Sequence, residues 1–508
     1  MAGKKRAELM TKIMVIGAGV GGMVSAARLA RAGHDVEIYE ASDRTGGKCR
    51  TEWIGDYAFD TGPSLLTLPA VYKDFFLKTG ARLEKSLVLE PVDPAFSYHF
   101  ADKTWVDFVN LDLPKTCAVI DDAFGKAAGD AWHSILQRAE VMWDISRVPF
   151  VQSQMPTLTS LLKQKDLLTG IKQIVPWKSL RNVVREYTND PHIQMIVDRY
   201  ATYSGSDPRK APAALLTIAF IEATFGAWHI QGGIGKLSES LEQRCRELGV
   251  KIHLNNSVKE IRTESGKVTG IINNRDEFIA APIVVANADA EVVYNQLLIS
   301  SVKNAKQERA KLQKSTKSLS GFSLLLGLDN SKYQGKLPNL SHHNVYFPQD
   351  YDAEFDEVFE RKVPVSDPTI YICAPRDSQM VKRENTESWF VLVNAPRHEP
   401  GSGWDWSGDS SSYAQMIIEK MDALGLQVSS RLDVMEYRTP LDLQNSTGAP
   451  GGSIYGTSSN GARSAFMRAK NRSPIHGLYC VGGSAHPGGG LPLVGISGEL
   501  VADAIGSA

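Results

Sequence analysis

The stretch that decides the fold is Lys12-Ile13-Met14-Val15-Ile16-Gly17-Ala18-Gly19-Val20-Gly21-Gly22-Met23, in which a short apolar run leads into a Gly-x-Gly-x-x-Gly turn. An Ala/Leu-rich helical pattern follows as far as Ala32, and a second apolar run, Val36 to Tyr39, ends on Glu40. Strand, glycine turn, helix, strand and carboxylate in this order are typical of a βαβ unit that binds a dinucleotide. The sequence therefore predicts a Rossmann-like α/β domain.

The glycine turn is predicted to hold a pyrophosphate. Gly17 lets the chain turn tightly, Gly19 lets the backbone approach the phosphates, and Gly22 lets the helix lie close to the strand. The start of the helix offers unpaired N–H groups and the positive end of its dipole. Glu40 lies about twenty residues further on, where a ribose-binding carboxylate is expected. The predicted contacts in this unit are Gly17, Gly19, Val20, Gly21, Gly22, Glu40 and Ala41.

A second glycine pair, Gly46 and Gly47, follows the ribose strand and lies between the cations Arg44 and Lys48. Adjacent glycines beside cations suit a second pass of backbone along the pyrophosphate. Arg44 or Arg50 would add charge-assisted contacts. Without the βαβ unit, a solvated basic loop would be the better interpretation, but the position here favours a cofactor contact.

The segment from Tyr57 to Ser64 alternates apolar and polar residues and ends in an Asp-x-Gly-Pro turn. We expect Gly62 to adopt a backbone conformation that other residues resist. We predict that Gly62, Pro63 and Ser64 belong to the same cofactor site.

Together, the glycine turn, Glu40, the Arg44 loop and Phe59-Asp60-x-Gly62-Pro63 resemble the bacterial-type phytoene desaturase family. These are FAD-dependent carotenoid desaturases within the amine-oxidase-like flavoproteins. Further stretches carry the same resemblance over nearly the whole chain: 199–208, 342–347, 367–369, 373–375 and 486–492.

The resemblance implies a mixed α/β (α+β) fold in which a Rossmann-like FAD-binding domain is assembled from discontinuous segments. The resemblance also implies an antiparallel-sheet substrate domain. It further implies a helical insertion that can associate with a membrane. The expected ranges are 10–75, 225–305 and 463–508 for the FAD-binding domain, 76–110 and 306–462 for the substrate domain, and 111–224 for the helical region. The resemblance also places Val258 near the adenine, and Asn287, Ala288 and Asp289 at a strand end in the cofactor site.

The C-terminal region carries a second glycine-rich loop, Gly482 to Pro492, between an apolar strand and a helical pattern that continues to Ile505. In many flavoproteins of this group such a loop and helix lie beneath the flavin, where a helix N-terminus stabilises the negative charge that develops on hydride uptake. Related proteins often have an acidic residue after the strand glycine, whereas Ser484 stands here. The predicted contacts are Gly483, Ser484, Gly490, Leu491, Pro492, Leu493 and Val494.

Desaturating a polyene removes a hydride from one carbon and a proton from its neighbour. The cation left by hydride loss is allylic, so a weak base suffices. His486 is the titratable group that the sequence places best for this role, although it could instead only shape the loop. The predicted function is an FAD-dependent desaturase of an acyclic carotenoid, of the phytoene desaturase or hydroxycarotenoid 3,4-desaturase type. The alternatives are a flavin amine oxidase acting on a small amine, and a carotenoid isomerase or oxygenase of the same fold.

A membrane surface is a predicted partner, with a lipophilic polyene as substrate and a quinone or oxygen as electron acceptor. From Arg147 to Arg185 seven cations face the single acid Asp166, among Leu and Trp residues, as in segments that lie at a bilayer interface. A solvated amphipathic cap is the alternative. The apolar stretch 211–228 is short for a span and contains Pro212 and Glu222, so we expect a buried helix there.

The overall composition argues against several other classes of function. The 508 residues are 43% apolar and 22% charged with a net charge of −1, which gives no general attraction to nucleic acid. No signal-length apolar run precedes the first strand, so we expect a cytoplasmic protein at the membrane periphery, not secreted and without a transmembrane helix. The five cysteines never have CxxC spacing, which argues against a zinc, iron–sulfur or disulfide framework.

The adjacent histidines His342 and His343 suggest a metal pair at first sight. Neighbouring residues on a strand point to opposite faces of the sheet. On that argument the two side chains cannot bind one ion, and no metal site is predicted.

Overall fold

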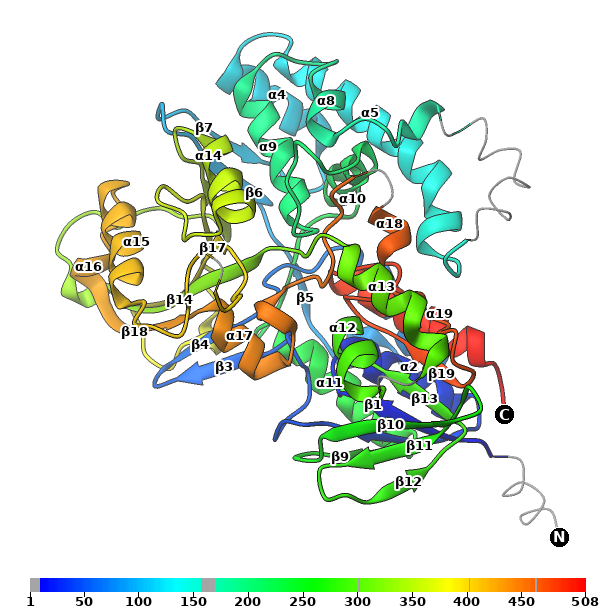
Figure 1. Cartoon of the computed structure of the whole chain (residues 1–508). Coiled ribbons are helices and arrows are strands. Elements are labelled where there is room, and N and C mark those ends of the chain that lie inside the picture. The colour runs from blue at the N-terminus through cyan, green and yellow to red at the C-terminus, as the bar shows by residue number, and fades with distance from the viewer. Residues whose placement is uncertain (1–9, 157–169, 171, 300–301, 402, 462–463) are drawn as a thin grey trace.

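The computed structural model describes residues 10–156, 170, 172–299, 302–401, 403–461 and 464–508. The chain forms a mixed α/β structure with three parts: a parallel sheet with its helices, a large mostly antiparallel sheet, and a group of helices at one end (Figure 1). The predicted fold class is confirmed.

The parallel sheet has five strands in the order β19-β13-β1-β2-β9, and all neighbours run parallel. Its strands come from the start, the middle and the end of the chain. They are β1 (Lys12–Ile16), β2 (Asp35–Tyr39), β9 (Lys251–His253), β13 (Ile283–Ala286) and β19 (Leu478–Cys480). The last four residues of β1 are buried, as expected for a central parallel strand that helices cover on both faces.

Helices α2 (Val20–Arg31) and α19 (Leu491–Ile505) pack directly on each other beside this sheet. A Cβ on Gly498 would lie 2.7 Å from Val24 Cγ1 and 3.1 Å from the Gly21 carbonyl oxygen. Small residues therefore let the two helix backbones approach closely. As a result the first and last helices of the chain begin on the same side of the sheet. Helices α3 (Ala70–Thr79) and α11 (Gly235–Glu247) also contact α2 or α19.

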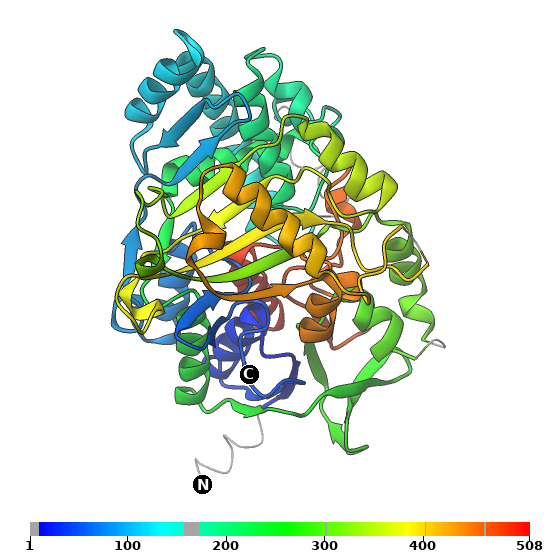
Figure 2. The same ribbon diagram turned by 90° about the vertical axis from the view of Figure 1, so that its left-hand side faces the viewer.

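The second sheet has seven strands in the order β18-β14-β17-β16-β15-β6-β7, antiparallel except for the β15–β6 pair (Figure 2). All ten residues of β14 are buried, because α15 (Ser411–Ala423) and its apolar neighbours cover one face of the strand and Tyr57 and Phe59 pack against the other. The strands are β6 (Phe96–His99), β7 (Trp105–Phe108), β14 (Ser320–Asp329), β15 (His343–Tyr346), β16 (Ile370–Cys373), β17 (Thr386–Ala395) and β18 (Leu432–Arg438).

Smaller elements join these layers. β3 (Thr51–Ile54) and β4 (Tyr57–Asp60) form a hairpin, and β5 (Leu89–Pro91) pairs with β8 (Trp228–Ile230) from a distant part of the chain. A three-stranded sheet consists of β10 (Val258–Glu264), β11 (Lys267–Asn273) and β12 (Phe278–Ala280). The remaining α-helices of these parts are α12 (Ala290–Val292), α13 (Lys306–Lys314), α14 (Tyr351–Asp356), α16 (Val428–Arg431), α17 (Pro440–Thr447) and α18 (Ser464–Met467).

The helical region comprises α4 (Leu113–Phe124), α5 (Ala128–Ser146), α8 (Leu180–Val184), α9 (Pro191–Thr202) and α10 (Thr217–Phe225). The buried helix expected over 211–228 forms only as α10, and within α10 only Ala219 and Glu222 are buried. A 3₁₀ turn, Ala213–Leu216, precedes α10, and Gly226 ends α10 before β8 begins. Among the residues that the structure describes, no helix is both long and apolar enough to cross a bilayer. Residues 157–169 and 171 of the predicted membrane-facing segment, with Lys163 and Lys165 among them, lie outside the described residues.

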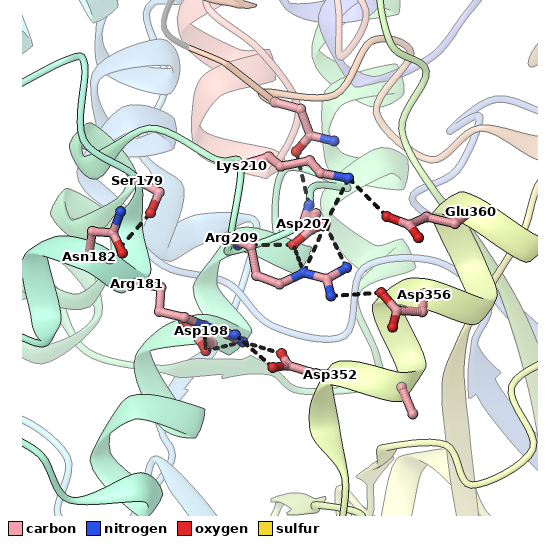
Figure 3. A network of polar contacts seen from close by, with 12 residues as sticks. Ser179, Arg181, Asn182, Asp198, Asp207, Arg209, Lys210, Asp352, Asp356 and Glu360 are labelled. Atoms are coloured by element: carbon pink, nitrogen blue, oxygen red, sulfur yellow. Dashed lines mark hydrogen bonds and ion pairs between the residues drawn. The ribbon is translucent and has the colours of Figure 1, made fainter.

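A network of ion pairs joins the helical region to α14 of the large-sheet part (Figure 3). The Arg181 guanidinium lies 2.7 Å from the Asp198 carboxylate and 2.6 Å from that of Asp352. Arg209 forms a second clasp, at 2.9 Å to Asp207 and 2.7 Å to Asp356. Because Asp198 is only 3% exposed, its charge depends on Arg181.

We predict that Arg181→Met lowers the free energy of unfolding at pH 8 by about 3–5 kcal/mol, because the Asp198 carboxylate stays buried without its partner. Lys259→Met is the control, since Lys259 pairs only with the exposed Asp276, at 2.8 Å, among the ion pairs of the described residues. The control variant should lower the free energy of unfolding by less than about 1 kcal/mol. Urea unfolding of both variants measures the difference, and equal losses would contradict this role of Arg181.

Candidate functional site

The glycine turn after β1 has the geometry that the sequence predicts. Gly17 has a φ of +90° and donates its N–H to the Tyr39 carbonyl at 2.8 Å, so the turn folds back on β2. The Glu40 carboxylate accepts the Ala18 N–H at 2.6 Å and the Ser42 N–H at 2.9 Å. The predicted ribose carboxylate thus lies against the predicted phosphate turn, and Ala41 follows it on the exposed surface.

The second glycine pair runs beside the first. Gly46 donates its N–H to the Ala18 carbonyl at 2.9 Å, and a Cβ on Gly47 would lie 3.3 Å from Gly19 Cα. Arg44 is not brought onto this turn, because its guanidinium is half exposed and pairs with Glu52 at 2.7 Å.

Gly62 is required for a different reason from the one expected. Its φ is not in the left-handed region, so the predicted unusual backbone conformation is wrong. A Cβ at Gly62 would instead collide with the Lys48 carbonyl oxygen, which makes this a close backbone approach. The residues that follow extend toward the large sheet, where the Ser64 hydroxyl lies 2.7 Å from that of Tyr371. The predicted residue Pro63 is partly buried between them.

The middle segment meets the glycine turn at the end of β13. Asn287 donates its N–H to the Ile16 carbonyl at 2.8 Å, and its amide lies under the turn. Asp289, two residues on after Ala288, caps α12 by accepting the Glu291 N–H at 2.8 Å. Val258 begins β10 just after Asn256, which donates its N–H to the Glu40 carbonyl at 2.8 Å. Both segments therefore lie beside the βαβ unit.

The C-terminal loop contacts the segment that follows β13. The Ser484 hydroxyl accepts the Ala290 N–H at 2.9 Å, next to the partly buried Gly483. α19 starts after Gly490, which has a φ of +100°, and no side chain caps its first turn. In that turn Leu491 and Pro492 are buried, whereas Leu493 and Val494 are partly exposed.

His486 lies in the same loop but is 1% exposed. Its Nε2 lies 2.8 Å from the Ser153 carbonyl oxygen, and since a carbonyl only accepts, Nε2 carries the proton. Burial lowers the pKa of His486 to about 4, so the ring is neutral at physiological pH, with its lone pair on Nδ1. The loop backbone is fixed at this residue, because the Asn471 amide donates to the His486 carbonyl at 2.8 Å.

Comparisons with known proteins agree on one family. The sequence model of the flavin containing amine oxidoreductases matches residues 20–331. A 1-hydroxycarotenoid 3,4-desaturase from Flavobacterium sp. (strain P99-3) is 30% identical over 98% of this chain and 99% of its own length. A 4,4'-diapolycopene oxygenase from Methylomonas sp is 29% identical over 97% of this chain and 98% of its own length. An oxidoreductase crystal structure from Methanosarcina mazei aligns over 97% of this chain and all of its own, with a TM-score of 0.63 at 17% identity.

The chain belongs to the flavin containing amine oxidoreductase family. Within it, the near-full-length match at 30% identity makes this protein a member of the carotenoid desaturase family. It is an FAD-dependent oxidoreductase, which confirms the cofactor that the sequence predicts.

The geometry of this carotenoid desaturase family member fits FAD. A Cβ on Gly19 would lie 2.5 Å from Asn287 Nδ2, and one on Gly22 would collide with the Gly17 carbonyl oxygen, so the turn leaves no room for side chains. No side chain caps the first turn of α2, which leaves its N–H groups for an anion. The first turn of α19 likewise has no side-chain cap, so both helices offer backbone N–H groups at their N-termini.

Two buried cations add to this electrostatic environment. Lys48 donates to the carbonyls of Ser453 and Ile454 at 2.8 and 2.9 Å. Burial lowers the pKa of Lys48 to about 8 and that of Arg468 to about 10. In both cases the Asp289 carboxylate opposes the shift. Two cations with one shared carboxylate leave a net positive charge, which suits the dianionic pyrophosphate of FAD.

Sequence reasoning missed two residues of this region. Gly482 lies against the Asn287 amide, since a Cβ there would be 2.6 Å from Asn287 Oδ1. Arg468 donates to the carbonyls of Tyr455, Thr457 and Gly483, each at 3.0 Å, and so ties the C-terminal loop to a distant turn. The glycine-rich composition around Gly482 could have indicated it. No local pattern singles out Arg468.

The argument against a metal pair at His342 and His343 is wrong. β15 begins at His343, so His342 precedes the strand and does not alternate with its neighbour. The centroids of the two rings lie 4.5 Å apart. The two side chains therefore occupy the same region of the structure.

We predict that Gly19→Val folds but purifies without most of its FAD. The Asn287 amide must turn away from the new side chain, and both groups then crowd the turn where the pyrophosphate would bind. The measurements are FAD per chain, from absorbance after denaturation, and circular dichroism for the fold. Gly408→Ala is the control, because its new methyl would lie 3.9 Å from its nearest neighbour. Full flavin content in Gly19→Val would refute the phosphate-turn assignment.

Proposed function

We propose that the protein desaturates an acyclic carotenoid, of the phytoene or 1-hydroxycarotenoid type. The observation that carries the proposal is the 30% identity, over almost the full length of both chains, to a 1-hydroxycarotenoid 3,4-desaturase. The glycine turn, the Gly46 loop and the C-terminal loop support it, because together they supply a site for FAD that spans the start, middle and end of the chain.

The residues that would hold FAD follow from the geometry. Gly17, Gly19, Val20, Gly21, Gly22 and the Gly46–Gly47 pair would face the pyrophosphate, Glu40 the ribose, and the first turn of α19 the flavin. When bound, FAD supplies a hydride acceptor at flavin N5. In the overall reaction one C–H bond gives up its electron pair as hydride, the electrons of the neighbouring C–H bond form the new double bond, and the proton leaves.

We assign His486 as the base that accepts this proton. Its Nδ1 lone pair is available because Nε2 donates to the Ser153 carbonyl. A conjugate acid with a pKa of about 4 makes this a weak base. A weak base suffices here, because the proton leaves a carbon beside a conjugated cation, which is far more acidic than an ordinary C–H.

α10 is the element that best suits a lipophilic chain. It buries its one acid, Glu222, against Arg199 and Tyr200, at 3.7 and 2.8 Å. Its apolar residues Ile218 and Phe220 are left partly exposed. This orientation is the reverse of an ordinary surface helix. It is expected where the solvent-facing side meets an apolar ligand or a membrane.

We also propose peripheral contact with a membrane through the segment around 147–185. Within this segment, Val148 is 53% exposed and Trp177 61% exposed. Near its start the chain contacts the C-terminal elements, where Gln154 donates to the Leu500 carbonyl at 2.8 Å and Ser153 accepts from His486. A polyene leaving the bilayer here would enter beside the proposed flavin site. A quinone or oxygen is the proposed electron acceptor.

The domain division proposed on this basis assigns 10–75, 225–305 and 463–508 to FAD binding. The substrate part is 76–110 with 306–462, and the helical part is 111–224. The membership of the two large sheets supports it, because the parallel sheet draws strands from the first three ranges and the seven-stranded sheet from the next two.

Anaerobic mixing tests the proposed function. Holoprotein mixed with an acyclic carotenoid in detergent should lose its oxidised-flavin absorbance, and the product should have lost two hydrogens by mass. Putrescine, a small amine, is the comparison substrate. Bleaching by the amine alone would show an amine oxidase, and a product that gains oxygen only when the mixture is repeated in air would show an oxygenase. Either result would replace the proposal.

Vesicle sedimentation tests the membrane contact. Neutralising Lys163, Lys165, Lys172 and Lys178 together to Gln should weaken binding to anionic vesicles at least about tenfold, since each lysine near such a surface contributes about 1 kcal/mol. The matched control is the Gln variant of four exposed lysines elsewhere, Lys303, Lys306, Lys314 and Lys336. Equal effects of the two sets would remove the proposal that this segment binds the membrane.

A further inference from the structure

Three sulfur- and nitrogen-bearing side chains meet between two strands of the large sheet. His343 on β15 is the direct cross-strand partner of Cys373 on β16, so both side chains lie on the same face. His342 lies beside them, with its ring centroid 4.5 Å from that of His343. One ring nitrogen of each histidine and the Cys373 Sγ all lie within 4.8 Å of one another.

The two histidines have unused nitrogen atoms in a dry environment. His343 is fully buried and Cys373 is 2% exposed. Among the described residues, neither His342 Nε2 nor His343 Nε2 has a hydrogen-bond partner. A buried polar atom without a partner costs about 1–3 kcal/mol, so two together call for an explanation. Burial lowers the pKa of His342 to about 3 and that of His343 well below its usual value, so both rings are neutral and keep a free lone pair.

The other nitrogen of His343 is held by a hydrogen-bonded chain. Its Nδ1 lies 2.8 Å from the Tyr371 hydroxyl, which in turn lies 2.7 Å from that of Ser64. Tyr371 therefore fixes the orientation of the His343 ring and leaves Nε2 as the unpaired atom. Histidines that bind metals usually have their second nitrogen fixed in this way by a neighbouring group.

We propose that His342, His343 and Cys373 bind one thiophilic metal ion, Zn²⁺ or Cu⁺. Two imidazoles and a thiolate are soft or borderline ligands, which favour these ions over Mg²⁺ or Ca²⁺. Ligand atoms around tetrahedral Zn²⁺ lie about 3.3–3.6 Å apart, given Zn–N and Zn–S bonds of about 2.0 and 2.3 Å. Small rotations of the imidazoles, whose χ2 is broadly allowed, close the difference. The Cys373 thiol releases its proton to solvent as the sulfur–metal bond forms, and one coordination position stays open.

His342 is the partly exposed member of the cluster. Asp377 stands in the wall of a surface cavity of about 840 Å³. Its carboxylate holds His229 Nε2 at 2.9 Å, and the His229 ring is centred 4.8 Å from that of His342. The cluster thus lies two side chains behind the cavity wall. The proposed ion would join β15 to β16, and its binding does not depend on which substrate the enzyme uses.

The test uses FAD-loaded protein, stripped of metals with a chelator and then dialysed against ZnCl₂ or, anaerobically, a Cu⁺ salt. One equivalent of at least one ion should remain after gel filtration, measured by elemental analysis. X-ray absorption at the edge of the bound metal should show one sulfur and two imidazole nitrogens. Cys373→Ser and His343→Ala should each abolish this equivalent. Tyr371→Phe, which removes only the group that orients His343, should weaken binding about 10–100-fold.

Matched controls separate this site from adventitious binding. Cys245→Ser alters another buried thiol, and His133→Ala removes an exposed histidine on α5. Both should leave the bound equivalent unchanged. Absence of any retained ion, a first shell without sulfur, or equal binding by Cys373→Ser and the parent would overturn the proposal. The spectroscopic result on the parent protein stands by itself if a ligand variant fails to fold.

Discussion

Close backbone packing at the end of β1 is the constraint on which the rest of the structure depends. The glycine turn, the Gly46 loop, Asn287 and Gly482 approach so closely that a single Cβ would displace a neighbour. These segments come from four distant parts of the chain, and each is held by a backbone hydrogen bond or strand pairing. A surface made of backbone N–H groups, with little side-chain bulk, is what a pyrophosphate requires. The same packing brings α19 against α2 and so determines where the C-terminal loop lies.

The other parts are attached to this unit by polar contacts across long distances in sequence. Arg468 binds three carbonyls around the C-terminal loop, and Arg181 and Arg209 join the helical region to α14 (Figure 3). Such buried or half-buried charges stabilise little by themselves, because their desolvation offsets much of the attraction. They do discriminate strongly against other arrangements, since a misplaced partner leaves a charge buried and unpaired. These contacts therefore specify where the helical region and the C-terminal loop lie.

Four histidines, three in or beside the large sheet and one in the C-terminal loop, have pKa values below their usual value and are neutral at pH 7. Burial is the first cause in His99, His342, His343 and His486 alike. A protein that handles an apolar substrate must keep water out, and a dry interior disfavours protonated imidazole. Neutral histidines are good metal ligands and weak bases, so one physical condition supports both roles that we assign to them.

By itself, the sequence determined the βαβ unit, the second glycine loop and the C-terminal strand, loop and helix. These elements depend on local rules: apolar runs, glycines at fixed spacing, and a carboxylate after a strand. Only the tertiary structure decided what lies under the turn and beside the loop. Asn287 beneath Gly19, Arg468 across three carbonyls, Gly62 against Lys48 and the meeting of His342, His343 and Cys373 are contacts between residues far apart in the chain, or depend on where a strand begins. Local spacing contains no information about such contacts, because they follow from sheet order and register.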